Sequence, residues 1–215
     1  MSLQNRVTPF GNIVAVPDRG LFMGNRSCLL HRGGRSKARP WGNRHWIICR
    51  TDYQDKRLPL REPGRNTQLF FLDEATALAA GHRPCFFCRR DDAVLFCDAW
   101  LRGNPEAGQA DSFRMDVLDN RLHAERVRPD GPKVTFRSRL KELSTGVFVS
   151  LDGEAEAAFL IAASTLWRWA PGGYTATQAL DPTVEATVLT PRSTVHAIRA
   201  GYVPVLHHSV FRERS

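Results

Sequence analysis

The sequence has no run of eighteen apolar residues. Its start, MSLQNRVTPFGN, lacks the basic segment followed by an apolar segment that marks a secretory signal. We therefore expect a soluble, cytoplasmic protein of the bacterial type. The sequence also has no recognisable catalytic triad, phosphate-binding loop or carboxylate pair. These absences favour a binding or structural role over an ordinary enzyme.

Cysteine is scarce, with only 5 residues in 215. The number is odd and the spacing is uneven, which is not typical of a disulfide framework. We expect reduced thiols, and the clearest pattern among them is the Cys85-x-x-Cys88 pair. Two cysteines at this spacing in a tight turn can direct both sulfurs at one tetrahedral ion, so the pair predicts half of a zinc site.

The stretch 73–90, DEATALAAGHRPCFFCRR, predicts a short helix followed directly by that turn. Asp73 is a good N-cap and an alanine-rich run follows it. Gly81 can adopt the left-handed conformation that ends a helix, and Pro84 cannot continue one. A redox pair would instead follow a strand in a βαβ pattern, so the local order favours metal binding.

The rest of the chain predicts an α+β protein with a small α/β zinc-binding module followed by a mostly β region. The module would cover residues 1–128, with a basic loop and two helices after the cysteine pair, and the β-rich region would cover 129–215, with a final short helix. We expect the module to contain a β-hairpin from strands at 12–17 and 21–24, strands at 45–50 and 68–72, and helices at 92–102 and 112–127. In the second region we expect strands near 133–137, 147–151, 159–162 and 185–190, then a helix that begins at Thr190-Pro191 and ends at Gly201.

Positive charge is concentrated in the first half of the chain. Residues 1–100 carry 16 Lys/Arg and 9 Asp/Glu, whereas residues 101–215 carry 14 and 13. A basic surface of this kind attracts phosphates, so DNA or RNA is the expected partner. The candidate nucleic-acid-binding residues are Arg32, Arg35, Lys37, Arg39, Arg50, Arg83, Arg89 and Arg90.

Several short motifs in residues 47–90 occur in register with one known domain. They are IICR at 47–50, RN at 65–66, EA at 74–75, ALAAG at 77–81, RPC at 83–85 and CR at 88–89. This segment resembles the N-terminal zinc domain of the Ada DNA-repair proteins, and the whole chain resembles a family of bacterial proteins that carry such a module. The resemblance implies a four-ligand zinc site, DNA binding and, in repair members, transfer of a methyl group from a backbone methylphosphotriester to a cysteine.

Carried over by position, the resemblance makes Cys85 and Cys88 two zinc ligands and makes Cys49 both a ligand and the methyl-accepting cysteine. The remaining family ligand would lie four residues after Cys49, where this sequence has Tyr53. A fourth ligand must therefore come from elsewhere. We favour His31, with Cys28 as the alternative, because both lie in an arginine- and glycine-rich loop that could reach the site; His45 and His82 are weaker candidates.

Three functions remain open at this point. The first is a structural Cys/His zinc site in a nucleic-acid-binding protein. The second is a methylphosphotriester-accepting repair protein that uses Cys49 once as a nucleophile, because Cys49 matches the methyl-accepting cysteine of the family. A site with one histidine carries less negative charge on its sulfurs than a site with four thiolates, which makes the sulfur less nucleophilic and favours the structural role. The third is an enzyme with a pocket between the two halves, for which His123, His207, His208 and Glu142 are the available acid–base groups.

Overall fold

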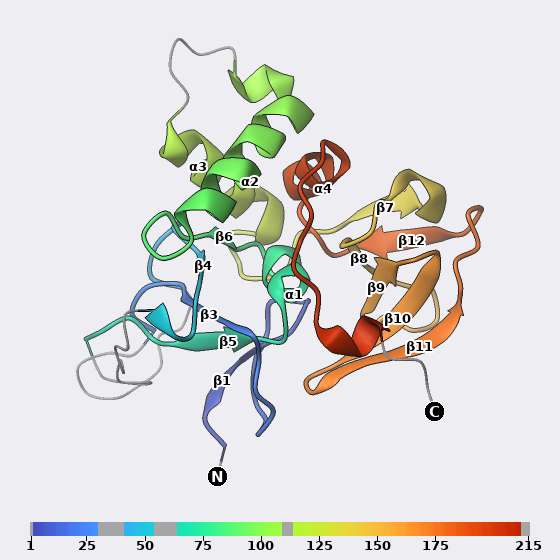
Figure 1. The fold of residues 1–215 in the computed structure, drawn as a ribbon, viewed down its shortest axis with the longest axis horizontal. Coiled ribbons are helices and arrows are strands. Elements are labelled where there is room, and N and C mark those ends of the chain that lie inside the picture. Colours follow the sequence, from blue (N-terminus) through green and yellow to red (C-terminus); the bar gives the residue numbers. More distant parts are fainter. Residues whose placement is uncertain (1, 30–40, 54–63, 109–113, 212–215) are drawn as a thin grey trace.

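A computed structural model of the protein describes residues 2–29, 41–53, 64–108 and 114–211. It contains two six-stranded sheets, one formed by the N-terminal part of the chain and one by the C-terminal part, with helices beside and between them (Figure 1). The α+β composition expected from the sequence is confirmed. Within the described residues, no helix is both long and apolar enough to cross a membrane.

The N-terminal sheet is mixed. Its strands follow the spatial order β2-β1-β5-β3-β4-β6, in which β1 pairs with β5 and β4 with β6 in parallel and the other pairs are antiparallel. The strands are β1 (Gln4–Val7), β2 (Ile13–Ala15), β3 (Phe22–Asn25), β4 (Ile47–Cys49), β5 (Leu69–Phe71) and β6 (Arg83–Pro84).

The expected hairpin between residues 12–17 and 21–24 is wrong. Both segments form strands, but β2 pairs with β1, and β3 lies two strands further into the sheet between β5 and β4. Turn-forming residues 17–20 mark a change of direction without deciding which strands pair. The partners of β3 come from residues 47–49 and 69–71, and such long-range pairing is not encoded in the local pattern.

The helical segments of the N-terminal part that lie in residues 64–108 and 114–128 are α1 (Glu74–Ala79), α2 (Arg90–Gly103), the short 3₁₀ helix η2 (Pro105–Gly108) and α3 (Met115–Arg126). The predicted start of α1 is confirmed, because the Asp73 carboxylate accepts a hydrogen bond from the backbone N–H of Thr76 at 2.8 Å. Its predicted end is also confirmed, since Gly81 has a φ of +88°.

The C-terminal sheet is antiparallel throughout, in the order β11-β10-β9-β8-β12-β7. Its elements are β7 (Phe136–Arg139), the 3₁₀ helix η3 (Leu140–Glu142), β8 (Phe148–Ser150), β9 (Phe159–Ala162), β10 (Thr165–Ala170), β11 (Gly173–Ala179) and β12 (Glu185–Val188). The chain then forms α4 (Arg192–Arg199) and η4 (His208–Phe211).

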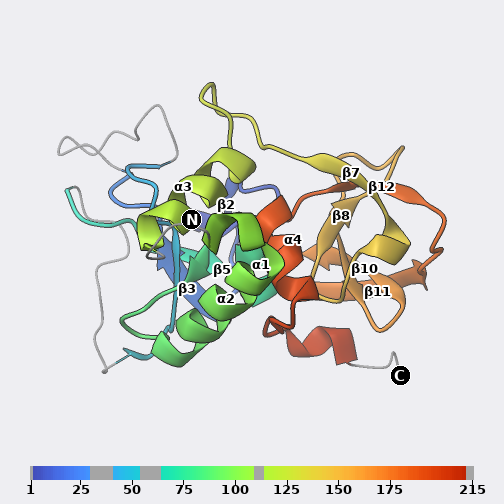
Figure 2. The same cartoon turned by 90° about the horizontal axis from the view of Figure 1, so that it is seen from above.

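Helix α4 joins the two parts. It lies between α2 and the C-terminal sheet (Figure 2). Ala197 on this helix packs in the N-terminal core, whereas Val195 and Ile198 pack in the core of the C-terminal sheet. A third buried cluster contains Leu72 and residues of α1 together with Phe148 of β8, so apolar burial stabilises the junction as well as each part.

Candidate metal centre

The pairing of β4 with β6 places Cys49 beside the turn that carries Cys85 and Cys88. The two strands are parallel with Ile48 opposite Pro84, and the backbone N–H of Cys85 donates to the carbonyl oxygen of Ile48 at 3.0 Å. The next residues in this register are Cys49 and Cys85. As a result, the sulfur atoms of Cys49, Cys85 and Cys88 all lie within 4.8 Å of one another.

The turn between Cys85 and Cys88 directs backbone N–H groups toward sulfur. The N–H of Phe87 donates to the sulfur of Cys85 at 3.4 Å, and the N–H of Arg89 closes the turn on the Cys85 carbonyl oxygen at 2.9 Å. Helix α2 begins at Arg90, and a helix N-terminus also favours negative charge nearby. The local backbone therefore stabilises thiolate at this turn.

The protonation of the three thiols is shared. Hydrogen bonds from Cys49 and Cys88 lower the pKa of Cys85 to about 2. The pKa of Cys49 is raised, most of all by hydrogen bonding to Cys85 and Cys88 and to a smaller extent by burial. The cluster therefore holds one thiolate readily and resists holding three, unless a cation replaces the remaining protons.

The sulfur positions fit a tetrahedral metal ion with soft ligands. Zinc–sulfur bonds of about 2.3 Å in tetrahedral geometry place neighbouring sulfurs about 3.8 Å apart. That spacing lies inside the 4.8 Å limit that all three sulfur pairs satisfy. Cys85 and Cys88 are buried and Cys49 is partly buried, so the ion would be largely shielded from water. Within the described residues, these three cysteines form the only group of three or more His, Cys, Asp or Glu side chains that lie close enough together to hold a metal ion.

The fourth ligand is not found among the described side chains. His31, the favoured candidate, lies outside the described residues. Cys28 is described and follows Asn25, the last residue of β3, which pairs with Ile47 at the start of β4. Cys49 lies at the other end of β4 and pairs with Met23, so Cys28 follows the end of β3 that is further from Cys49. Its assignment, like that of His31, stays a prediction.

The weaker histidine candidates have other roles. Nδ1 of His45 lies 2.6 Å from a carboxylate oxygen of Asp119. His82 is buried, with Nε2 accepting from Arg26 at 3.2 Å and Nδ1 facing the Ala77 carbonyl oxygen at 3.3 Å. Neither histidine belongs to the cysteine group.

A pocket of about 280 Å³ opens onto the three cysteines. Its wall includes Tyr53, whose ring makes an edge contact with Phe87 at 5.3 Å between centroids. Phe87 and Arg50 line this pocket, and Phe87 is 71% exposed. Arg50 is also exposed, as is Arg90, which lies two residues after Cys88.

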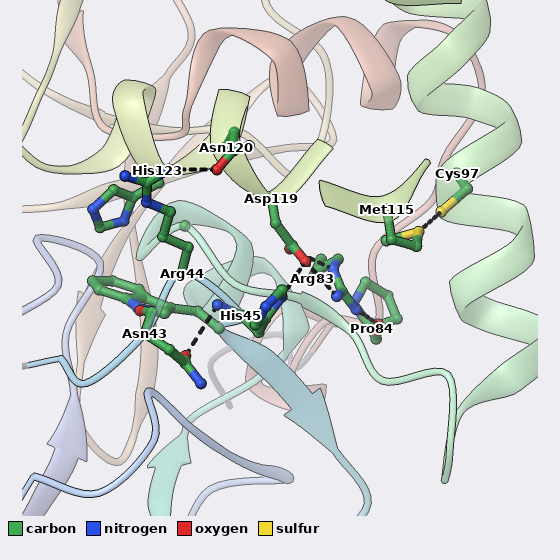
Figure 3. Close-up of polar contacts among 12 residues, drawn as sticks. Asn43, Arg44, His45, Arg83, Pro84, Cys97, Met115, Asp119, Asn120 and His123 are labelled. Atoms are coloured by element: carbon green, nitrogen blue, oxygen red, sulfur yellow. Dashed lines mark hydrogen bonds and ion pairs between the residues drawn. The ribbon is translucent and has the colours of Figure 1, made fainter. Parts of the chain in front are cut away.

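Two of the predicted nucleic-acid-binding arginines serve the fold instead. Arg83 is buried and donates to both carboxylate oxygens of Asp119 on α3, as Figure 3 shows. Arg89 is buried between the carboxylates of Glu74 and Asp92, at 2.8 Å from each. With their charges neutralised internally, Arg83 and Arg89 are not available for external phosphates.

The other predicted nucleic-acid-binding residues fall into two groups, those that the structure describes and those that lie outside the described residues. Arg50 and Arg90 are exposed, and their role in nucleic-acid binding stays a prediction. Four others lie outside the described residues: Arg32, Arg35, Lys37 and Arg39.

The four groups suggested for an enzyme do not converge on one site. Nδ1 of His123 lies 3.0 Å from Arg126, and Glu142 accepts from Ser138 at 2.9 Å on the C-terminal sheet. His207 and His208 stack on each other near the end of the chain, with ring centroids 4.0 Å apart. None of these contacts places an acid and a base around a shared cavity.

Sequence reasoning missed the buried acidic pair at the start of α1. The sequence identifies Asp73 only as a helix cap, yet its second carboxylate oxygen accepts a hydrogen bond from the hydroxyl of Tyr174 at 2.8 Å. Glu74 accepts from the hydroxyl of Tyr202 at 2.7 Å. The acidic dipeptide at a helix start was visible in the sequence, but its partners lie about a hundred residues away.

Comparison of the chain with family models, curated proteins and solved structures found no match.

Proposed function

We propose that Cys49, Cys85 and Cys88 bind one structural Zn²⁺, with His31 as the fourth ligand. The observation that carries this proposal is the convergence of three sulfur atoms within 4.8 Å. Sulfur donors in tetrahedral arrangement suit zinc, and the resemblance of residues 47–90 to the Ada zinc domain agrees with that choice. When bound, zinc keeps its cysteine ligands deprotonated, because its positive charge offsets the repulsion among three neighbouring thiolates.

A structural role follows from what the site connects. Cys49 ends β4, Cys85 follows β6 and Cys88 precedes α2, so one ion would fasten three elements of the N-terminal part. We expect a chelator that removes the ion to lower the melting temperature markedly and added zinc to restore it. An unchanged melting temperature after verified metal removal would contradict a structural role.

The fourth ligand is tested by paired substitutions. His31→Ala should weaken zinc binding, whereas Cys28→Ser should leave it unchanged. Competition with a zinc chelator of known affinity measures both variants. If Cys28→Ser weakens binding and His31→Ala does not, the assignments of these two residues must be exchanged.

We further propose that the surface around the pocket binds DNA or RNA through phosphates. Arg50 and Arg90 supply exposed positive charge there, and Phe87 offers an exposed ring on which a base could stack. The excess of basic residues in the first hundred positions supports the same partner.

Fluorescence anisotropy with labelled DNA and RNA, on zinc-loaded protein, tests this partner. Binding should weaken steeply with salt. Arg50→Gln and Arg90→Gln should each weaken binding and lower the salt slope by about one. Arg139→Gln removes an exposed charge from β7 on the other sheet and should have no effect. Absence of salt-dependent binding would rule out a nucleic-acid partner.

A second candidate function uses Cys49 as a methyl acceptor. The observation that favours it is the position of Cys49 on the pocket wall, where it is less buried than Cys85 and Cys88. The Cys49 thiolate would attack the methyl carbon of a methylphosphotriester, forming a sulfur–carbon bond. The carbon–oxygen bond would break, and its electron pair would remain on the phosphate oxygen of the resulting diester anion.

Mass spectrometry of the protein after incubation with methylphosphotriester DNA tests this second candidate. The expected result is one added methyl group on the peptide that contains Cys49, in an amount that does not exceed one per chain. Unmodified Cys49 after prolonged incubation would eliminate the repair function while leaving the zinc site intact.

A further inference from the structure

Three basic side chains from distant parts of the sequence line a second cavity, separate from the cysteine pocket. Arg26 comes from the segment after β3, Arg126 from the end of α3 and Lys133 from the following hairpin. The cavity has a volume of about 260 Å³, and aromatic rings of Trp41, Trp46 and Phe10 form part of its wall. No carboxylate is among the described residues that line it.

The two arginines are almost completely buried, with 1% of Arg26 and 2% of Arg126 exposed. Both guanidinium groups lie over the ring of Trp46, at 4.0 and 3.9 Å from its centroid. Such contacts compensate a buried cation only in part, because a ring carries no net charge. Two neighbouring cations are therefore held inside the protein mainly by neutral surroundings.

The hydrogen bonds of these cations also go to neutral acceptors. Arg26 donates to the Gly11 carbonyl oxygen at 2.9 Å and to His82, and its Nη2 atom has no hydrogen-bond partner within the described part of the chain. Arg126 donates to the carbonyl oxygens of Gly81 and Arg44, both at 2.8 Å. Its Nε atom likewise has no partner there.

Lys133 adds a third positive group at the partly buried edge of the cavity. Its ammonium nitrogen donates to the Ala79 carbonyl oxygen at 2.7 Å, which leaves further N–H donors for another acceptor. Asp119 raises the pKa of Arg126, but burial and repulsion from Arg26 lower it by more. Both oxygens of Asp119 already accept hydrogen bonds from Arg83, so that carboxylate offsets only part of the positive charge.

Burial and mutual repulsion make this arrangement costly without a counter-charge. Burial lowers the pKa of Arg26 to about 9, and burial with repulsion from Arg26 and Arg126 lowers the pKa of Lys133 to about 7. Buried charges in folded proteins are normally paired, because an unpaired one costs several kcal/mol. The excess positive charge around a cavity whose described lining contains no carboxylate points to an external anion.

We propose that the cavity lined by Arg26, Arg126 and Lys133 binds the phosphate group of a small phosphate monoester. A phosphate dianion matches clustered cationic donors better than a singly charged carboxylate, since arginine forks and an ammonium group complement its several oxygens. At about 260 Å³ the cavity lies just below the range of about 300–1,000 Å³ that is typical of small-molecule pockets, which restricts the ligand to a compact ester. This site does not depend on the metal centre or on nucleic-acid binding.

Isothermal titration calorimetry on the zinc-loaded protein tests the proposal with two probes, inorganic phosphate and a nucleoside 5′-monophosphate. Both titrations are made at an ionic strength matched with chloride. Equal affinity for the two probes supports a site that recognises phosphate alone, and tighter binding of the mononucleotide supports recognition of the ester. Absence of binding by both probes up to millimolar concentration overturns the proposal.

Lys133→Met is the informative variant, because it keeps most of the apolar part of the side chain and removes the ammonium group, and with it the charge and the hydrogen bond to Ala79. It should weaken binding of the tighter probe about tenfold or more. Arg128→Met is the matched control, since Arg128 is exposed next to this cluster and does not line the cavity. Melting temperature without ligand verifies that both variants fold. Wild-type affinity in folded Lys133→Met would also overturn the proposal.

Discussion

Both carboxylate oxygens of Asp119 accept hydrogen bonds from the guanidinium group of Arg83, each at 2.8 Å. Arg83 lies in β6, two residues before Cys85, and Asp119 lies in α3. This buried ion pair therefore holds β6, the strand directly before Cys85, against α3, whose Asp119 is thirty-six residues further along the chain.

Asp119→Ala should destabilise the protein by about 3–5 kcal/mol, because it leaves the Arg83 charge buried without a partner. Urea unfolding measures this loss. The double variant Arg83→Met with Asp119→Leu should recover part of it, since no buried charge remains. A loss below about 1 kcal/mol in the single variant would mean that the pair is more hydrated than the structure indicates.

Two tyrosine hydroxyls connect the C-terminal part to the start of α1. Tyr174 donates to Asp73 and Tyr202 donates to Glu74. Tyr174→Phe and Tyr202→Phe should each lower the free energy of unfolding by about 1.5–3 kcal/mol, the range for hydrogen bonds to charged groups. Urea unfolding of both variants checks this, and a loss below about 0.5 kcal/mol in each would contradict a stabilising role for these contacts.

The lowered pKa of Lys133 predicts a pH dependence of stability. Its pKa is about 7 in the folded protein and 10.5 is the ordinary value, so between these pH values the unfolded chain binds the additional proton. Stability contributed by this group therefore rises as pH increases from 7 to 10.5. Arg26 and Arg126 are the charged groups that lower this pKa, and Ala79 supplies the neutral acceptor.

Unfolding of wild type and Lys133→Met in chloride buffer measures this effect. The variant lacks the Lys133 ammonium group and therefore lacks this pH-dependent contribution to stability. Its stability relative to wild type should be highest near pH 7 and should decline as pH rises toward 10. Parallel stability profiles over that range would show that Lys133 titrates normally.

Local patterns predicted local structure well. The cap at Asp73 and the stop at Gly81 are confirmed, because both depend on residues within one or two helical turns. The hairpin at 12–24 is wrong, because strand partners are chosen by packing across the whole sheet. Local sequence signals therefore located the strands without assigning their neighbours.

The cysteine site was predictable to different degrees. The spacing of Cys85 and Cys88 by itself predicts half of a metal site, whereas Cys49 is predicted as a ligand only through the family resemblance. Its position depends on the parallel pairing of β4 with β6, which no local pattern encodes. The sequence indicates surface charge at Arg83 because its acidic partner Asp119 is distant in sequence. Arg89 has one acidic partner nearby, Asp92, but its burial against Glu74 is not encoded in the local pattern.

The metal content of the purified protein tests the central claim most directly. Elemental analysis combined with native mass spectrometry should find one zinc per chain in wild type and in Cys97→Ser, whose buried thiol lies outside the cysteine group. Cys49→Ser and Cys85→Ser should lose most of that zinc. Stoichiometric zinc in folded Cys49→Ser and Cys85→Ser, or its absence from wild type prepared without chelator and supplied with zinc, would contradict the account.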